Sequence, residues 1–193
     1  MREQIIKAAT DQIKKYGFRR FTIEDIASDL GISKKTIYKY FEGKDQIISA
    51  VCSTHMKMKK ERVLMVLATG GTWFDKMMGL VCTDSKRDEA DVQLVLELKR
   101  YFPEEWKKQE VMSACLAEYM KDFLRQGIIS GDIRPDIDID VLWTIINGSF
   151  EALCDAEFNE LSPKQVLTAM SKVFLHGILT PESKMRGACE SEE

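Results

Sequence analysis

The residues best suited to chemistry lie between Thr22 and Phe41, in the stretch TIEDIASDLGISKKTIYKYF. Cations and hydrogen-bond donors gather there on the outward face of one short helix: Lys34, Lys35, Thr36, Tyr38 and Lys39. Such a face suits the phosphates and base edges of nucleic acid. An ordinary helical hairpin would instead expose charges of both signs, so the pattern favours a nucleic-acid contact.

Two short helices joined by a tight turn would hold that face. Thr22 caps the first helix, and Gly31 ends it because glycine takes a left-handed conformation without steric cost. Ser33 caps the second helix, which is expected from Ser33 to Tyr40. Apolar residues recur at helical spacing and should point inward: Ile23, Ile26, Ala27, Leu30, Ile37, Tyr40 and Phe41. The stretch therefore predicts a helix-turn-helix, whose second helix enters the major groove.

The first 48 residues carry a set of residue types whose spacing is typical of one known DNA-binding domain. They are Ile5, Ala8, Ala9, Gly17, Phe18, Thr22, Ile26, Ala27, Gly31, Ser33, Thr36, Tyr38, Tyr40, Phe41 and Lys44. With these residues, the segment resembles the DNA-binding domain of the TetR family of bacterial transcription regulators. A Gly-x-Ile-Arg sequence at 131–134, followed by an acidic run, extends the likeness more loosely over most of the chain.

The resemblance implies a DNA-binding regulator, and a repressor in particular, acting as a homodimer on a near-palindromic double-stranded operator. Candidates for base contacts are Lys34, Lys35, Thr36 and Lys39. The residues matched to the family's phosphate contacts are Thr22, Tyr38, Tyr40 and Lys44. The expected domains are a helix-turn-helix domain over 1–46, a helical effector-binding and dimerisation domain over 47–180, and a disordered tail over 181–193.

Composition points to an all-α chain with a basic N-terminal part. Of 193 residues, 45% are hydrophobic, and Gly and Pro number only 11 and 4. Residues 1–60 carry 13 Lys and Arg against 7 Asp and Glu, although the whole chain has a net charge of -3. The longest apolar run, Val63 to Ala68, is too short for a membrane span. The five cysteines are an odd number without close spacing, which argues against a disulfide framework and suggests a reducing compartment. A cytoplasmic protein without a membrane partner is expected.

Further helices are expected at 2–16, 44–68, 73–81, 89–101, 103–127, 140–157 and 162–179. Aromatic residues and methionines concentrate in the middle of the chain, where they could enclose a small, largely apolar effector or simply pack a core. The candidate ligand residues are Phe74, Met77, Phe102, Trp106, Met112, Tyr119 and Phe123.

Apolar stripes also run along the last two helices. They include Trp143, Ile146, Phe150, Met170 and Phe174. Such stripes usually pack within a chain, but the resemblance implies that these two helices form a dimer interface with a second copy.

No catalytic set, cofactor motif or metal site emerges, so an enzyme is not expected. The two histidines, His55 and His176, lie far apart, and no Gly-rich phosphate loop is present. Cys52 and His55 share a helix face but supply only two metal ligands, too few for a closed site. A metal- or thiol-responsive regulator remains an alternative, and a small all-α enzyme using the aromatic cluster is another.

Overall fold

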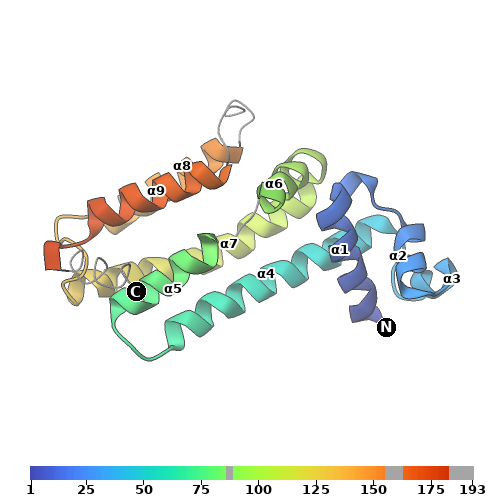
Figure 1. The fold of residues 1–193 in the computed structure, drawn as a ribbon, viewed down its shortest axis with the longest axis horizontal. Coiled ribbons are helices and arrows are strands. Elements are labelled where there is room, and N and C mark those ends of the chain that lie inside the picture. Colours follow the sequence, from blue (N-terminus) through green and yellow to red (C-terminus); the bar gives the residue numbers. More distant parts are fainter. Residues whose placement is uncertain (86–88, 155–162, 183–193) are drawn as a thin grey trace. The chain divides into compact units, whose positions relative to one another are not determined.

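The computed structural model describes residues 1–85, 89–154 and 163–182, with the backbone alone at 81–85, 89–93, 150–154, 163, 164, 166–168 and 171. These residues form an all-helical fold, as predicted (Figure 1). The helices are α1 (Arg2–Arg20), α2 (Ile23–Leu30), α3 (Lys34–Tyr38), α4 (Lys44–Ala68), α5 (Trp73–Ser85), α6 (Glu89–Tyr101), α7 (Pro103–Ile129), α8 (Ile139–Cys154) and α9 (Pro163–Ile178). An isolated antiparallel bridge joins Ile133 to Leu179.

The helix bounds follow the predicted ones closely. Helices α4 and α6 match their predicted ranges, whereas α5 and α7 continue past the predicted ends to Ser85 and Ile129. The predicted end of the helix after α7, at 157, lies outside the described residues, and so does the predicted disordered tail from residue 183 onward.

The chain packs as two compact units. The first holds residues 1–61 and 90–113, and the second holds residues 62–89 and 114–193. Helices α4 and α7 each contribute to both units, and most of α6 belongs to the first. The functional boundary at residue 46 stays a prediction.

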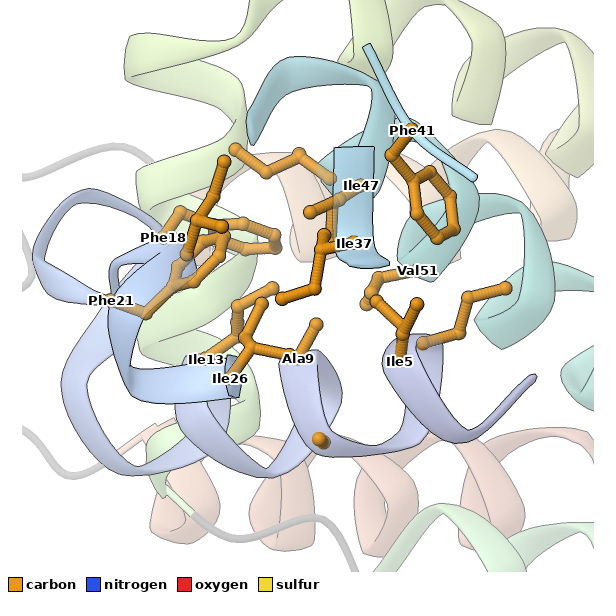
Figure 2. Packing of buried hydrophobic residues seen from close by; sticks show 14 of the residues in the cluster. Ile5, Ala9, Ile13, Phe18, Phe21, Ile26, Ile37, Phe41, Ile47 and Val51 are labelled. Atoms are coloured by element: carbon orange, nitrogen blue, oxygen red, sulfur yellow. The ribbon is translucent and has the colours of Figure 1, made fainter. Parts of the chain in front are cut away.

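The core of the first unit is built from isoleucine and phenylalanine. Figure 2 shows apolar side chains of α1 turned toward those of α2, α3 and α4. Residues with at most 2% exposure include Ile5, Ala9, Ile13, Phe21, Ile26, Ile37, Phe41, Ile47 and Ile48. Because short helices gain most of their stability from packing, this core is what holds α2 and α3 in place.

A glycine kink interrupts α1 near its end. Gly17 has φ 83° and ψ 168°, a region that is nearly exclusive to glycine. The predicted helix ended here, at Gly17 and Phe18; in the structure, helical turns resume and run to Arg20. The kink turns the buried Phe18 into the core of the first unit.

The core of the second unit centres on a stacked pair of rings. The rings of Trp73 in α5 and Phe123 in α7 have centroids 5.1 Å apart, and the Trp73 indole N–H donates to the Phe123 carbonyl at 2.8 Å. This close approach leaves no room for a side chain at Gly127. A Cβ there would lie 2.5 Å from the Trp73 ring and 2.9 Å from Ile133.

The end of α9 is tied to the turn after α7 by backbone hydrogen bonds. The Arg134 amide donates to the Ile178 carbonyl, and the Thr180 amide donates to the Asp132 carbonyl, each at 2.9 Å. The Gly-x-Ile-Arg sequence noted above is therefore a structural turn of the second unit.

Replacing Gly127 with alanine should destabilise the second unit. Alanine favours helices, but its methyl group would overlap the Trp73 ring, and overpacking of this kind costs roughly 1–3 kcal/mol. Thermal or urea unfolding measures the loss. Gln126→Ala is the control, because Gln126 is the exposed neighbour of Gly127 in α7, and this substitution should be close to neutral. Equal effects of the two substitutions would contradict the packing argument.

Candidate nucleic-acid interface

The start of α2 is closed by a capping box between Thr22 and Asp25. The Thr22 hydroxyl accepts from the Asp25 amide at 3.2 Å and donates to the Asp25 carboxylate at 2.6 Å, while the Thr22 amide donates to that carboxylate at 2.8 Å. These hydrogen bonds from Thr22 lower the pKa of Asp25. Thr22 therefore caps α2 as predicted, and it stays exposed at a helix end whose dipole favours anions.

The turn between α2 and α3 is fixed by its own backbone. Gly31 adopts the predicted left-handed conformation (φ 62°, ψ 33°), and the Ile32 amide donates to the Ala27 carbonyl at 3.0 Å. Ser33 caps α3, since its hydroxyl accepts from the Thr36 amide at 3.2 Å. With Ile37 fully buried, these contacts decide which side of α3 faces outward.

The outward side of α3 and of the following turn carries cations and phenols. Lys35 and Lys39 are exposed and form no ion pair with the part of the chain that the structure describes. Tyr38 is 53% exposed, and Thr36 lies partly buried with its hydroxyl 3.0 Å from that of Ser33. This surface offers ammonium and hydroxyl donors without a neighbouring carboxylate on α3 itself.

Lys34 is placed differently from Lys35. Its ammonium is hydrogen-bonded to the Glu24 carboxylate of α2, and both side chains are exposed. This hydrogen bond is the main reason that the pKa of Glu24 is lowered. A DNA contact by Lys34 would first require this pair to open, and exposed ion pairs such as this one are weak.

The expectation that Tyr40 points into the core is wrong: its side chain is 43% exposed. Helix α3 ends at Tyr38, two residues before the predicted end, so the helical period no longer applies at Tyr40. Phe41, only 2% exposed, fills the core instead. The exposed Tyr40 stays compatible with its other predicted role, a phosphate contact.

Lys44, at the start of α4, binds the protein's own backbone. Its ammonium donates to the carbonyls of Arg19 at 2.9 Å and Phe21 at 2.7 Å, and lies 4.3 Å from the centre of the Phe21 ring. Partial burial lowers the pKa of Lys44. An ammonium has three N–H donors, so one is left over for a phosphate.

Two contacts at the end of α1 were not predicted from the sequence. The Phe18 amide donates to the Glu97 carboxylate of α6 at 2.8 Å, across 79 residues of sequence. The Arg19 guanidinium lies 4.6 Å from the centre of the Tyr101 ring. No local pattern marks either partner, because a lone glutamate and a lone tyrosine on a helix usually face solvent.

The candidate ligand residues are divided between the two units. Phe74, Met77 and Phe123 are buried together in the core of the second unit. Phe102 and Trp106 pack against the core of the first unit. Met112 and Tyr119 are exposed, at 42% and 45%. The structure thus brings three of the seven residues together.

The candidate dimer residues lie along α8 and α9. Trp143, Ile146 and Phe174 are partly buried against the core of the second unit, and Met170 is also partly buried. The side chain of Phe150 lies outside the described residues. On the same two helices, apolar side chains remain exposed: Val141 at 56%, Ile145 at 50% and Val173 at 70%.

The described residues offer little for metal or thiol chemistry. They contain no cluster of three or more His, Cys, Asp or Glu residues suited to a metal ion. Burial, with a smaller contribution from Glu105, raises the pKa of the Cys52 thiol to about 11. The reactive form of a cysteine is the thiolate, so Cys52 is a poor sensor near neutral pH. None of the described helices could cross a lipid bilayer.

Comparison with known proteins gives a family match over the helix-turn-helix. The sequence profile of the bacterial regulatory proteins of the tetR family matches residues 5–51, which span α1 to the start of α4. Residues 5–51 therefore form a TetR-family domain. Members of this family bind DNA and small-molecule effectors, typically as dimers. The chain that carries this domain is a transcriptional regulator.

The relatives of this chain are named as regulators. The transcriptional repressor KstR2 of Mycolicibacterium smegmatis is 25% identical over 150 residues, which cover 75% of this chain and 73% of that protein. The fatty acid metabolism regulator protein of Bacillus subtilis is 26% identical over 153 residues, covering 77% and 78%. A transcriptional regulator of Saccharomonospora viridis, solved with choline, shares the fold with a TM-score of 0.76 at 20% identity, covering 93% and 97%.

Removing Lys35 should weaken DNA binding more than removing Lys34. Lys35 has no ion pair within the described chain, whereas Lys34 must leave Glu24 to reach a phosphate. Lys35→Ala should reduce affinity for duplex DNA roughly tenfold and lower the salt slope by about 1 per subunit. Fluorescence anisotropy over a salt series measures both quantities. A larger loss for Lys34→Ala than for Lys35→Ala would contradict the assignment.

Cys52 should resist alkylation in the folded protein. With a pKa of about 11, on the order of one Cys52 thiol in ten thousand is ionised near pH 7. Iodoacetamide should therefore modify the exposed Cys115 first, and its reaction with Cys52 should accelerate as the pH rises toward 11. Peptide mapping by mass spectrometry separates the two sites. Fast labelling of Cys52 near neutral pH would revive a thiol-sensing role.

Proposed function

We propose that the chain is a repressor that binds a near-palindromic operator as a homodimer and is released by a small, largely apolar effector. The observation that carries this proposal is the capped helix-turn-helix, in which Ile37 is buried and Lys35, Tyr38 and Lys39 are exposed on the opposite side. The relative named as a transcriptional repressor supports repression over activation.

In the proposed complex, α3 of each subunit lies in a major groove, and the two copies are spaced by one DNA turn, about 34–36 Å. Lys34, Lys35, Thr36 and Lys39 contact bases or reach their edges. Phosphates are held by the exposed start of α2 at Thr22, by Tyr38 and Tyr40, and by the remaining donor of Lys44.

The proposed dimer forms through α8 and α9. Val141 and Ile145 lie one turn apart on the same side of α8, and Val173 is the corresponding exposed residue on α9. Exposed apolar residues on two helices favour burial against a second copy. The candidates Trp143, Ile146, Phe150, Met170 and Phe174 would flank this contact, and the partly buried ones would belong to the core and the interface alike.

The proposed effector site lies in the second unit, beside Phe74, Met77 and Phe123. Aromatic walls with an adaptable methionine suit a hydrocarbon ligand. The Bacillus subtilis relative is named for fatty acid metabolism, which supports an apolar effector, whereas the choline-bound neighbour is the precedent for a small cation. An effector that couples to DNA binding by about 1–3 kcal/mol would change operator affinity 5- to 150-fold.

Selection from random duplex DNA tests the operator proposal. The wild type should enrich a near-palindrome with half-sites one helical turn apart, and a Lys35→Ala, Lys39→Ala double variant should not. If the wild type enriches no sequence, and both proteins lose affinity alike as salt rises, the helix pair is only a basic surface and the operator proposal fails.

The effector proposal is tested by titrating the operator complex with straight-chain fatty acids of increasing length and, separately, with choline. We expect a fatty acid to release the operator. Phe74→Leu should weaken that release while leaving operator affinity intact, because Phe74 is buried in the second unit. Val111→Ala, a change at a 70% exposed residue of α7, is the control. Release by choline alone would replace the apolar effector with a cationic one.

A further inference from the structure

The kink in α1 is closed by a carboxylate from a helix outside the helix-turn-helix. Glu97 of α6 accepts a hydrogen bond from the Phe18 amide at 2.8 Å. Both of its carboxylate oxygens lie 2.7 Å from the position that a Cβ of Gly17 would occupy. The lack of a side chain at Gly17 is therefore what admits the carboxylate.

The kink also explains why a carboxylate is useful there. A break in helical geometry leaves the first amides of the next turn without carbonyl partners from the preceding turn. Phe18 begins that turn, directly after Gly17. A hydrogen bond from an amide to an ionised carboxylate is stronger than one between neutral groups. Glu97 thus acts as a cap supplied from a distant part of the sequence.

Apolar and aromatic contacts seat α6 on the same segment. Leu98, next to Glu97, is 4% exposed in the core of the first unit. The rings of Phe18 and Phe102 have centroids 5.8 Å apart, and the Arg19 guanidinium lies over Tyr101. The backbone at Phe18 and Arg19 is consequently held by both side-chain packing and the Glu97 hydrogen bond.

The segment that Glu97 holds leads directly to two proposed phosphate contacts. Lys44 binds the carbonyls of Arg19 and Phe21, so the position of its ammonium depends on where these two carbonyls lie. Thr22, the cap of α2, follows Phe21 in the chain. Residues 18–22 therefore connect the Glu97 carboxylate to both Lys44 and Thr22 within the first unit.

We propose that Glu97 is a positioning residue for DNA binding. By holding the Phe18 amide, its carboxylate fixes the segment 18–22 and thereby sets the Lys44 ammonium and the start of α2 at the spacing that phosphates require. The inference rests on the proposed DNA contacts of Thr22 and Lys44. It adds a residue of α6 to a function otherwise carried by α1 to α4.

Three substitutions of Glu97 separate positioning from general stability. Glu97→Gln keeps an acceptor oxygen at the same reach, Glu97→Ala removes the acceptor, and Glu97→Asp shortens the side chain by one methylene. Glu104→Ala, a change at an exposed glutamate of α7 in the same unit, is the control. Affinity is measured over a salt series on the selected operator and on random duplex DNA, because phosphate contacts act on both.

We expect Glu97→Ala and Glu97→Asp to weaken binding to both DNAs roughly tenfold and to lower the salt slope by about 1 per subunit, as loss of the Lys44 contact would. Glu97→Gln should bind within about threefold of the wild type, since its amide oxygen still accepts from Phe18. Hydrogen exchange at the Phe18 amide should accelerate in the Ala and Asp variants alone. Glu104→Ala should match the wild type throughout.

The inference is overturned if Glu97→Ala and Glu97→Asp keep the affinity and salt slope of the wild type, or if Glu97→Gln is as weak as Glu97→Ala. Should the Ala variant fail to fold, the milder Asp and Gln pair decides the question. If the wild type enriches no operator, the proposed function fails, while the comparison on random duplex DNA still decides the role of Glu97.

Discussion

The burial of Ile37 in the core of the first unit is the contact on which the orientation of α3, and with it the proposed DNA recognition, depends. Helix α3 spans only Lys34–Tyr38, and a helix this short has no stability of its own. The fully buried Ile37 and the Ser33 cap together hold it in one rotation about its axis. That rotation exposes Lys35, Tyr38 and Lys39 on one side, so the chemistry of the surface follows from the packing of the opposite side.

Features encoded by neighbouring residues were predictable from the sequence. The Thr22 cap, the left-handed Gly31 and the Ser33 cap each depend on residues within a few positions, and all three are confirmed. The bounds of α4 follow from neighbouring residues in the same way, since Gly43 precedes the helix and Gly70 and Gly71 follow it. Tyr40 shows where this reasoning fails: a period holds only while the helix continues, and α3 ends before that residue.

Features that join distant residues were not predictable. The Glu97 contact crosses 79 residues, and the partners of Lys44 are backbone carbonyls, which have no signature in the sequence. Likewise, counting aromatic residues and methionines could not show that Phe74 and Phe102 belong to different cores. A stripe such as that of α8 identifies an apolar face without identifying what covers it.

The pair between Lys34 and Glu24 has a consequence for how the protein searches a genome. Glu24 occupies the ammonium that a phosphate would otherwise take, and thus acts as an internal competitor on the reading surface. Any duplex, whatever its sequence, must displace this carboxylate before it gains the charge of Lys34. Phosphate attraction supplies nearly all binding to non-cognate DNA. Under the proposed DNA contact of Lys34, this competition therefore lowers the affinity for any duplex and favours release from non-cognate sites.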